Sequence, residues 1–375
     1  MSYPNIKKKV LLVTPFLQAI GGVANYYKTI LPLLKESNFN IDYLEIGSAK
    51  SNNNPFHSLA DQIKFYHKIK TGYDLVHVNP SLDLKSFIRD GLFIRIAKRH
   101  DIPVIVFFRG WDQNFAKYIE SYFLRLFWFT YGKADAFILL ASQFEKKLRS
   151  WGITSPSYLQ TTTIDHNLLN GVDIENKIKS FRQKKTIRIL YLARIERAKG
   201  VFETVDAIRI LHQNQVQVQL SIAGDGPARY ELESYVRTIG LSAEQNGQIN
   251  FLGYIRDQDK AAAFLNHDIY CLPSYSEGLP NSVLEAMVFG LPVITCAVGG
   301  LVDLFRDTDL GSLVPLQNPQ AIAETIEAFA KDRQRMTRIA INNHSYAKEN
   351  FLAPKVANKL LKVYQQTINN TYNER

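Results

Sequence analysis

The sequence predicts an α/β protein made of two doubly wound domains, and three observations support this prediction. The chain has 375 residues, a length that fits two domains better than one. Strand-like and helix-like segments alternate from end to end, which is the pattern of right-handed βαβ units. The strand-like segments are apolar throughout, as expected for parallel sheets that are covered on both faces.

The first half of the chain forms one such series. Its expected strands are short runs rich in Val, Ile, Leu and Phe, and its expected helices are longer segments of mixed polarity. We expect strands at 8–16, 39–47, 73–80, 102–110 and 135–142, and helices at 24–37, 57–70, 84–100 and 114–132. The segment at 175–188 is polar and strongly basic, and we interpret it as the end of the first domain and the linker.

A second series follows the expected linker. We expect strands at 187–194, 218–226, 249–255, 268–274, 292–298 and 311–317, with helices at 200–214, 228–240, 260–267 and 281–290 between them and further helices from 319 onward. The predicted domains are therefore 1–178 and 179–352, followed by a C-terminal helix at 353–375. Ligands of such folds bind beyond the carboxyl ends of the strands, so the turns after the strands are where binding residues are expected.

Composition narrows the functional classes. The net charge of +10 suggests an anionic partner: a nucleic acid, an anionic bilayer or a phosphorylated small molecule. No zinc-ligand cluster or RNA-binding motif favours nucleic acid, and no run of about 18 apolar residues predicts a membrane-spanning helix. Cys271 and Cys296 lie in apolar strand-like segments and are expected to be reduced core residues, which fits a cytoplasmic protein.

The segment PSYSEGLPNSVLEAMVFGLPVI is the most informative part of the chain. Its helix-like portion is apolar nearly all round and is therefore expected to be buried, so Glu285 needs a partner with hydrogen-bond donors. A ribose diol would serve, although a first-turn Glu also complements the helix dipole. Glu277 lies in the turn just before this helix, within reach of a reacting group.

Two further turns carry features suited to phosphate. Arg194 and Lys199 follow a strand of the second domain, where two cations are well placed for a diphosphate, although a solvated basic turn is the alternative. Gly21 and Gly22 follow the first strand, where glycine allows a ligand to approach a helix start closely. Taken alone, the pair favours an ordinary βα turn over a ligand site. The Gly-rich turn that contains Gly224 has a mainly structural explanation.

Four motifs in order make the second domain resemble a known family. They are RIERAKG, AGDGP, FLGYI and SEGLPNSVLEAM followed by LPVI. Together they resemble the nucleotide-sugar domain of retaining glycosyltransferases of the GT-B architecture, family 4, also called glycosyl transferases group 1. The resemblance is strong over 186–315 and extends weakly to the glycine turn at Gly21–Gly22. It implies two Rossmann-like domains facing each other across a cleft, with the C-terminal helix crossing back onto the first.

The resemblance also implies roles for individual residues. Arg194 and Lys199 would hold the donor diphosphate and stabilise the leaving group, and Glu277 would contact the donor sugar near its anomeric carbon. Glu285 would bind the ribose hydroxyls. The remaining expected donor contacts are Gly21, Gly22, Gly224, Tyr254, Ile255, Gly278, Leu279 and Asn281.

The first domain departs from the family pattern at one position. Where the family often has His-Gly, this chain has Arg109-Gly110. Arginine stays protonated and cannot be a general base, but it could bind an anionic acceptor group or neutralise the leaving phosphate. The plain alternative is a salt bridge to Asp112. His77 and Asn79, at another strand end, are expected to contact the acceptor, together with Asp112. A structural role is an equal alternative for a lone His at such a position.

We expect no metal requirement and no cofactor, because the cations would replace a metal ion. The two D-x-D triplets, at 257–259 and 307–309, lie in polar turns and are expected to be solvated or to cap helices. The helices at 84–100 and 114–132 combine aromatic and basic residues, so they either cover the sheet or lie on an anionic membrane.

The sequence therefore predicts a retaining, hexosyltransferase-type glycosyltransferase that acts in polysaccharide or glycoconjugate synthesis at the cytoplasmic membrane surface. Its partners would be a nucleotide sugar such as a UDP-sugar and a glycan or lipid-linked acceptor, without nucleic acid. The alternatives are a binding protein that holds a nucleotide sugar without turnover, an epimerase or phosphorylase of the same fold, and a nucleic-acid or membrane adaptor.

Overall fold

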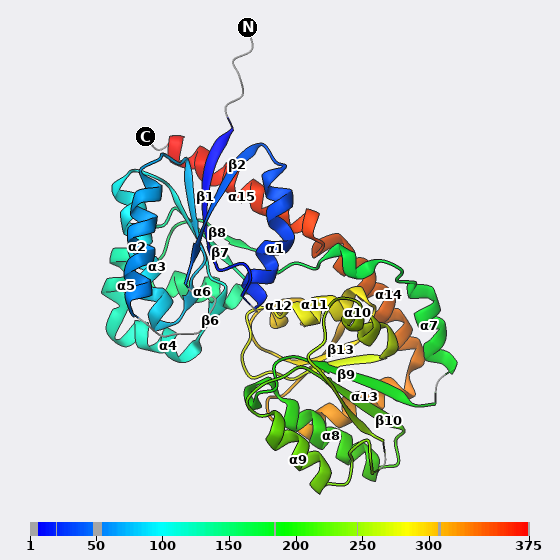
Figure 1. Cartoon of the computed structure of the whole chain (residues 1–375). Coiled ribbons are helices and arrows are strands. Elements are labelled where there is room, and N and C mark those ends of the chain that lie inside the picture. The colour runs from blue at the N-terminus through cyan, green and yellow to red at the C-terminus, as the bar shows by residue number, and fades with distance from the viewer. Residues whose placement is uncertain are drawn as a thin grey trace. The chain divides into compact units, whose positions relative to one another are not determined.

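A computed structural model of the chain divides into two compact units (Figure 1). Unit 1 comprises residues 1–163 and 353–375, and unit 2 comprises residues 164–352. The structure describes residues 7–19, 21–47, 55–183, 185–245, 247–306 and 309–373. Within these ranges each unit has a six-stranded sheet whose pairings are all parallel. The predicted α/β fold with two Rossmann-like domains is confirmed.

The sheet of unit 1 has the order β2-β1-β3-β5-β7-β8. Its strands are β1 (Lys8–Pro15), β2 (Phe39–Ile46), β3 (Leu75–Val78), β5 (Val104–Phe107), β7 (Ala136–Leu139) and β8 (Ser157–Leu159). Every residue of β3, β5 and β7 is buried, as the continuous apolar runs predicted.

Helices cover both faces of this sheet. Helices α1 (Gly22–Lys35) and α15 (Ala353–Asn373) pack together on one face, and α2 (Pro55–Ile69), α3 (Leu84–Arg99) and α5 (Leu124–Thr130) lie on the other (Figure 1). A short ladder of β4 (Ser81–Leu82) and β6 (Gly110–Trp111) accompanies the sheet, and α6 (Ser142–Ser150) follows β7. Asp83 starts α3 as an N-cap that accepts a hydrogen bond from the Ser86 amide.

The long helix expected at 114–132 is interrupted. It consists of α4 (Gln113–Tyr118), a π-helical turn at Ile119–Phe123, α5, and a 3₁₀ turn at Tyr131–Lys133. The residue pattern of the π-helical turn does not differ from that of the α-helical segments on either side, so the sequence did not predict the interruption. Phe127 and Tyr131 pack in the core, whereas Tyr118, Tyr122 and Trp128 are exposed, so these aromatics serve both core and surface.

The sheet of unit 2 has the order β11-β10-β9-β12-β13-β14. Its strands are β9 (Ile187–Leu192), β10 (Val218–Ala223), β11 (Ile249–Gly253), β12 (Ile269–Leu272), β13 (Val293–Cys296) and β14 (Gly311–Val314). Cys271 and Cys296 are buried and free, as predicted.

The helices of unit 2 also lie on both faces. Helices α8 (Val201–Gln213), α9 (Arg229–Thr238) and α13 (Pro319–Lys331) lie on one side of the sheet, and α10 (Asp257–Asn266), α11 (Asn281–Val288) and α12 (Leu301–Phe305) on the other (Figure 1). Helix α14 (Arg333–Asn350) packs against α11.

The predicted linker is wrong in one respect. Residues 175–183 belong to helix α7 (Ile174–Gln183), which packs against α14 as part of unit 2. Phe181 is buried, and the buried Lys177 Nζ donates to the Phe264 carbonyl at 2.5 Å. The segment has many basic residues and few apolar ones, so its sequence did not indicate a helix with a buried face. The division therefore falls between residues 163 and 164 rather than at 178.

Candidate functional site

The predicted donor-binding residues lie in the turns that follow neighbouring strands of unit 2. Arg194 and Lys199 follow β9, and Glu277 follows the adjacent strand β12. Lys199 lies at the end of a 3₁₀ turn, Arg197–Lys199, which leads into α8. The amide of Tyr275 donates to the Ala198 carbonyl at 2.9 Å, which ties these two turns together.

Glycine makes the close approach of these turns feasible. Gly200 has φ 71°, and a Cβ there would lie 2.3 Å from the Pro273 carbonyl oxygen. Gly299 has φ 53°, and a Cβ there would lie 2.0 Å from the Glu277 carbonyl oxygen. Both conformations favour glycine, and both contacts exclude any side chain. The backbone near Gly200 and the backbone near Gly299 therefore both pack closely against the turn that carries Glu277.

Lys199 and Glu277 form an ion pair. Lys199 Nζ donates to Glu277 Oε1 at 2.7 Å, and the two side chains are 25% and 12% exposed. An ammonium group has three donors, so this bond leaves two N–H groups of Lys199 for other acceptors. Arg194 has a 69% exposed side chain that pairs with Glu196 through Nε at 3.1 Å. Its remaining guanidinium N–H groups are available to a ligand.

Glu285 lies on α11 and is buried, as its apolar helix predicted. Its partner is Lys260 on α10, whose Nζ lies 2.5 Å from each carboxylate oxygen; the geometry of a hydrogen bond holds only for Oε1. Oε2 is buried, and the described residues give it no hydrogen-bond partner. The carboxylate is therefore paired in charge but retains an acceptor for a hydroxyl. Sequence reasoning missed Lys260, whose signal was a lone cation preceding the apolar run AAAF.

The start of α11 offers backbone donors. Pro280 is its N-cap and provides no side-chain capping bond, so the amides of the first turn rely on other acceptors. Gly278 and Asn281 are half-buried beside this start, whereas Leu279 is buried. The Gly278 carbonyl accepts the Gly300 amide at 2.6 Å, a support from the turn after β13 that sequence reasoning also missed.

The other predicted donor contacts lie in turns of the same sheet. Tyr254 follows β11 with 61% exposure, and Ile255 is half-buried beside it. Gly224 follows β10 with φ 140°, and a Cβ there would lie 2.0 Å from the Ala193 carbonyl oxygen. Packing between turns therefore requires this glycine. A contact of Gly224 with a donor stays a prediction.

In unit 1 the predicted residues Gly21 and Gly22 precede and open α1. Gly21 is the N-cap and makes no side-chain capping bond. A Cβ at either glycine would meet nothing within 4 Å. Packing within the described part of the chain therefore does not demand glycine there, which leaves room for a ligand.

Arg109 follows β5 and is 8% exposed. Its guanidinium carbon lies 4.0 Å from the ring centre of Tyr26 and 4.3 Å from that of Phe107. Among the described residues no carboxylate pairs with it, and its Nε and Nη1 have no hydrogen-bond partner. The alternative of a salt bridge to Asp112 is thus excluded there: the Asp112 side chain caps α4, accepting from the Asn114 and Phe115 amides.

The burial of Arg109 is energetically unfavourable. A buried ion without a partner costs several kcal/mol. Stacking on aromatic faces returns about 2 kcal/mol. Burial raises the pKa of Tyr26 to about 12, and the nearby Arg109 charge opposes this shift.

His77 and Asn79 lie next to Arg109 in unit 1. His77 is fully buried, and its Nδ1 lies 2.7 Å from Tyr364 Oη of α15. Burial, reinforced by the Arg109 charge, lowers the pKa of His77 to about 3, so the ring is neutral at physiological pH. Asn79 accepts from Tyr27 Oη at 2.5 Å and donates to the Val13 carbonyl at 2.8 Å. Contacts of these residues with an acceptor stay predictions.

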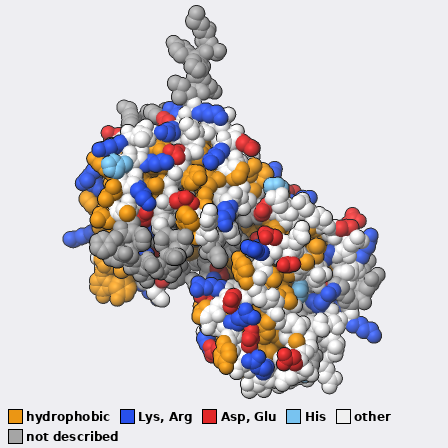
Figure 2. All heavy atoms as spheres, in the orientation of Figure 1, with side chains coloured by type: hydrophobic (Ala, Val, Ile, Leu, Met, Phe, Trp, Pro, Cys, Tyr) orange, Lys and Arg blue, Asp and Glu red, His pale blue; other side chains and the backbone are white. Residues whose placement is uncertain are grey.

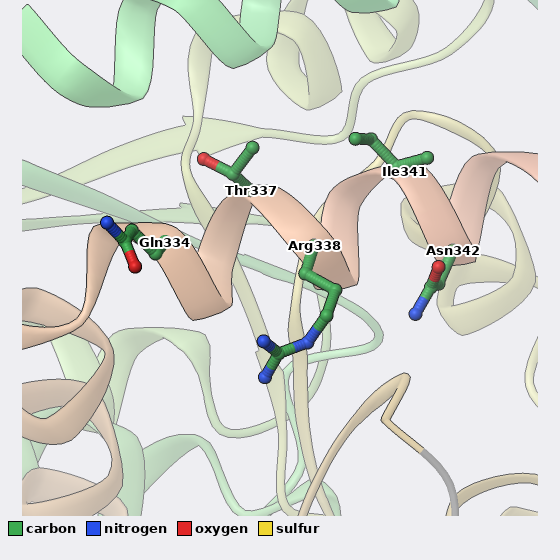
Figure 3. Close-up of a pocket in the computed structure, with 5 residues that line it drawn as sticks. All are labelled: Gln334, Thr337, Arg338, Ile341 and Asn342. Atoms are coloured by element: carbon green, nitrogen blue, oxygen red, sulfur yellow. The ribbon is translucent and has the colours of Figure 1, made fainter.

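One surface hollow lies elsewhere, on α14 of unit 2 (Figure 3). It is lined by Gln334, Thr337, Arg338, Ile341 and Asn342, which all come from this one helix. It contains none of the predicted site residues, and Arg338 points to Asp309, with which it pairs at 2.6 Å. Asp307 and Thr308, in the second D-x-D triplet, lie outside the described residues.

No group of three or more His, Cys, Asp or Glu side chains in the described part of the chain is placed to hold a metal ion. In the same ranges no helix is both long enough and apolar enough to cross a membrane.

Comparison with known proteins shows what parts of this chain resemble. Residues 172–345 match the family described as glycosyl transferases group 1. A Bacillus subtilis (strain 168) protein named for teichuronic acid biosynthesis, TuaC, is 26% identical over 78% of this chain and 70% of its own length. Most of the other curated relatives are matched over about half of their length.

Two solved structures share the fold. Sucrose-phosphate synthase from Thermosynechococcus elongatus has a TM-score of 0.74 and 19% identity, covering 96% of this chain and 99% of the other. Anabaena HepE in complex with UDP-glucose has a TM-score of 0.70 and 18% identity, covering 96% of this chain and 100% of the other. At these identities the likeness concerns the fold.

Proposed function

We propose that the chain is a member of the glycosyl transferases group 1, whose family model matches residues 172–345. In this proposal it is a retaining glycosyltransferase that transfers a hexose from a nucleoside diphosphate, such as a UDP-sugar, to a hydroxyl of a glycan or lipid-linked acceptor. The arrangement of Lys199, Glu277 and Glu285 around the carboxyl ends of β9 and β12 carries the proposal. A cation suits the diphosphate and carboxylates suit the sugar hydroxyls, all at the sheet edge where such folds bind ligands.

In this proposal Arg194 and Lys199 neutralise the charge that develops on the leaving diphosphate. Lys199 has N–H groups beyond its bond to Glu277, so it can bind a phosphate oxygen while Glu277 stays fixed. The start of α11 adds backbone amides to the same anion. The Glu285 carboxylate, which Lys260 pairs in charge, accepts a hydrogen bond from a ribose hydroxyl through one of its remaining lone pairs.

The bond between the anomeric carbon and the diphosphate oxygen breaks while the acceptor oxygen bonds to the same face of the sugar. The leaving phosphate takes the proton of the acceptor hydroxyl. Glu277 interacts with the donor hydroxyls and helps to hold the sugar for this same-face attack. UDP is the preferred nucleotide by analogy with the UDP-glucose complex of Anabaena HepE.

Donor binding tests the site. UDP and UDP-, GDP- and ADP-sugars are added to the purified chain, and the shift of its thermal midpoint is measured. Lys199→Ala and Glu285→Ala should each abolish the shift produced by the preferred donor while the variants stay folded. Lys331→Ala is the matched control, because this exposed lysine at the end of α13 pairs with Glu327 and belongs to neither the β9 turn nor the β12 turn. A normal shift in both site variants contradicts the proposal.

Product analysis separates the enzyme classes. Transfer of sugar with retained configuration, read by NMR of the product anomer, supports the proposal. Donor binding without transfer or hydrolysis favours a binding protein without turnover, and conversion of one nucleotide sugar into another favours an epimerase.

We also propose that unit 1 contacts an anionic membrane surface. Helix α3 exposes Leu84, Ile88 and Leu92, which are spaced by four residues and form one stripe. Tyr122, at 74% exposure, and Phe129, at 55%, lie exposed on the neighbouring helical segment. On the face of unit 1 that Figure 2 shows, Lys and Arg side chains lie among hydrophobic ones, together with some Asp and Glu. Basic and apolar side chains in such proximity suit an anionic bilayer.

A further inference from the structure

Arg109 differs from the other buried charged side chains of the described residues. Those side chains each have an ion-pair or hydrogen-bond partner, as the Arg89–Asp90 pair at 2.8 Å illustrates. They are Asp61, Asp90, Lys177, Asp268 and Glu285. Arg109 has aromatic rings on its faces and two buried nitrogens, Nε and Nη1, without a partner. A buried cation of this kind lacks the anion that would balance it.

The surroundings of Arg109 add donors but no acid. Tyr26 Oη is fully buried beside the guanidinium, which interacts with it by charge and by hydrogen bonding. His77 Nε2 is also buried, and among the described residues it has no hydrogen-bond partner. Both side chains lie around the guanidinium, Tyr26 beneath it and His77 stacked on Phe107 with ring centres 6.0 Å apart. Arg109 and His77 therefore both have buried nitrogens without a hydrogen-bond partner among the described residues, which is rare for buried polar atoms.

The cluster lies at the carboxyl-end edge of the unit 1 sheet. Arg109 and His77 come from the carboxyl-end portions of the adjacent strands β5 and β3, and Tyr26 comes from the second turn of α1. This is the sheet edge at which ligands of doubly wound folds bind. The open space over Gly21 and Gly22, at the start of α1, belongs to the same helix.

We propose that Arg109, with Tyr26 beside it, forms an anion-binding subsite of unit 1, and that the sugar acceptor carries a phosphate or carboxylate which this subsite recognises. The planar guanidinium presents its N–H groups in a fork that matches either anion. This inference rests on the proposed glycosyltransferase function and specifies the chemical class of its acceptor.

Paired probes test the charge of the acceptor. Glucuronate and glucose 6-phosphate are compared with glucose at equal ionic strength by the shift of the thermal midpoint of the full chain. The wild type should respond to the anionic sugars and not to glucose. Arg109→Gln should bind the anionic sugars roughly tenfold more weakly or worse, because charge-assisted hydrogen bonds are lost. Lys85→Gln removes the same charge from the exposed surface of α3 and should keep the response.

The binding of UDP to the same variants distinguishes the sources of the anion. UDP should bind Arg109→Gln as it binds the wild type, because the donor site lies on unit 2. Loss of UDP binding without any response to the anionic sugars means that Arg109 serves the donor diphosphate, and overturns the proposal. Failure of the wild type to bind any nucleotide sugar contradicts the proposed function instead, whatever the anionic sugars do.

Stability without ligand gives an independent test. Arg109→Met replaces an unpaired buried cation with an apolar side chain, so its thermal midpoint should equal or exceed that of the wild type. Arg89→Met leaves the buried Asp90 without its partner and should lower the midpoint. A drop for Arg109→Met as large as that for Arg89→Met, or failure of Arg109→Met to fold, shows that the cation is structural and overturns the proposal.

Discussion

Lys260 Nζ of α10 lies 2.5 Å from the carboxylate of Glu285 on α11, so the acid expected to bind ribose is already charge-paired in the free protein. The pair is asymmetric, because the Lys260 side chain is 21% exposed and that of Glu285 only 8%. If its partner is removed, the Lys260 ammonium can therefore be hydrated by water, whereas the Glu285 carboxylate stays largely shielded from water. Removal of Lys260 and removal of Glu285 should therefore lower the stability of unit 2 by different amounts.

Lys260→Ala should destabilise unit 2 more than Glu285→Ala. It leaves a buried carboxylate without a cation, which costs roughly 3–5 kcal/mol. Glu285→Ala leaves a lysine that can reach water, so its cost should be clearly smaller. Urea unfolding followed by circular dichroism measures both. Equal losses would show that the pair is as solvated on one side as on the other.

Gly299→Ala should displace the turn that carries Glu277, because the new Cβ would lie 2.0 Å from the Glu277 carbonyl oxygen. Gly240→Ala is the matched control: its φ is 74° and its Cβ would meet nothing within 4 Å. The control should lose about 1–2 kcal/mol from the left-handed backbone alone. Gly299→Ala should lose more and should also weaken donor binding, measured by calorimetry. Unchanged donor affinity in a folded Gly299→Ala would contradict the support role of this glycine.

The pH dependence of unit 1 should depend on His77. Its pKa is lowered from 6.5 to about 3 in the folded state, so the unfolded state binds the proton first as the pH falls. The contribution of neutral His77 to the free energy of unfolding is therefore fully present above pH 6.5. It is lost progressively as the pH falls from 6.5 toward 3. Between pH 7 and pH 5 this residue should account for about 2 kcal/mol of the loss.

His77→Gln should lack that part of the loss. Tryptophan fluorescence is a selective probe, since Trp111, Trp128 and Trp151 all belong to unit 1. Urea midpoints of wild type and variant, compared at the two pH values, give the difference directly. Parallel losses in both proteins would show that His77 is protonated as easily in the folded state as in the unfolded one.

The sequence predicted the sheet of unit 2 and the positions of its turns because both depend on local signals. Buried parallel strands appear as continuous apolar runs, and the turns after them hold Arg194, Lys199 and Glu277 at fixed positions in the chain. Side-chain contacts between segments that are distant in the sequence could not be predicted. The Lys199–Glu277 and Lys260–Glu285 pairs join residues that are far apart in the sequence, and no local pattern encodes such a contact.

Helix α7 and the surroundings of Arg109 were also difficult to predict from the sequence, because both depend on tertiary packing. In α7 the charged residues around Phe181 suggested a linker, and only packing against α14 shows which face is apolar. For Arg109 the sequence offered Asp112 as a neighbour three residues away, but the carboxylate turns to cap α4 instead. Competition between a helix cap and a salt bridge is decided by backbone geometry, which the sequence alone does not reveal.

Ile88→Ser combined with Leu92→Ser should weaken membrane binding of the full chain without unfolding it. Both side chains are about half exposed, at 51% and 47%, so they contribute little to the core. Their burial in the interfacial region of a bilayer would stabilise the bound state by roughly 2–4 kcal/mol together. Co-sedimentation with vesicles of phosphatidylcholine containing phosphatidylglycerol, compared with phosphatidylcholine alone, measures the effect.

Ile341→Ser with Leu316→Ser is the matched control, because these residues of unit 2 are exposed to the same degree, at 49% and 50%. The control should bind vesicles like the wild type. Binding of the wild type should require the anionic lipid and should fall with salt, because Lys85 and Arg99 of α3 carry positive charge beside the stripe. Equal binding of both double variants, or wild-type binding that ignores lipid charge, would contradict a membrane role for this face. A concentration-dependent dimer that the Ile88 and Leu92 changes abolish would show instead that the stripe pairs with a second copy of the chain.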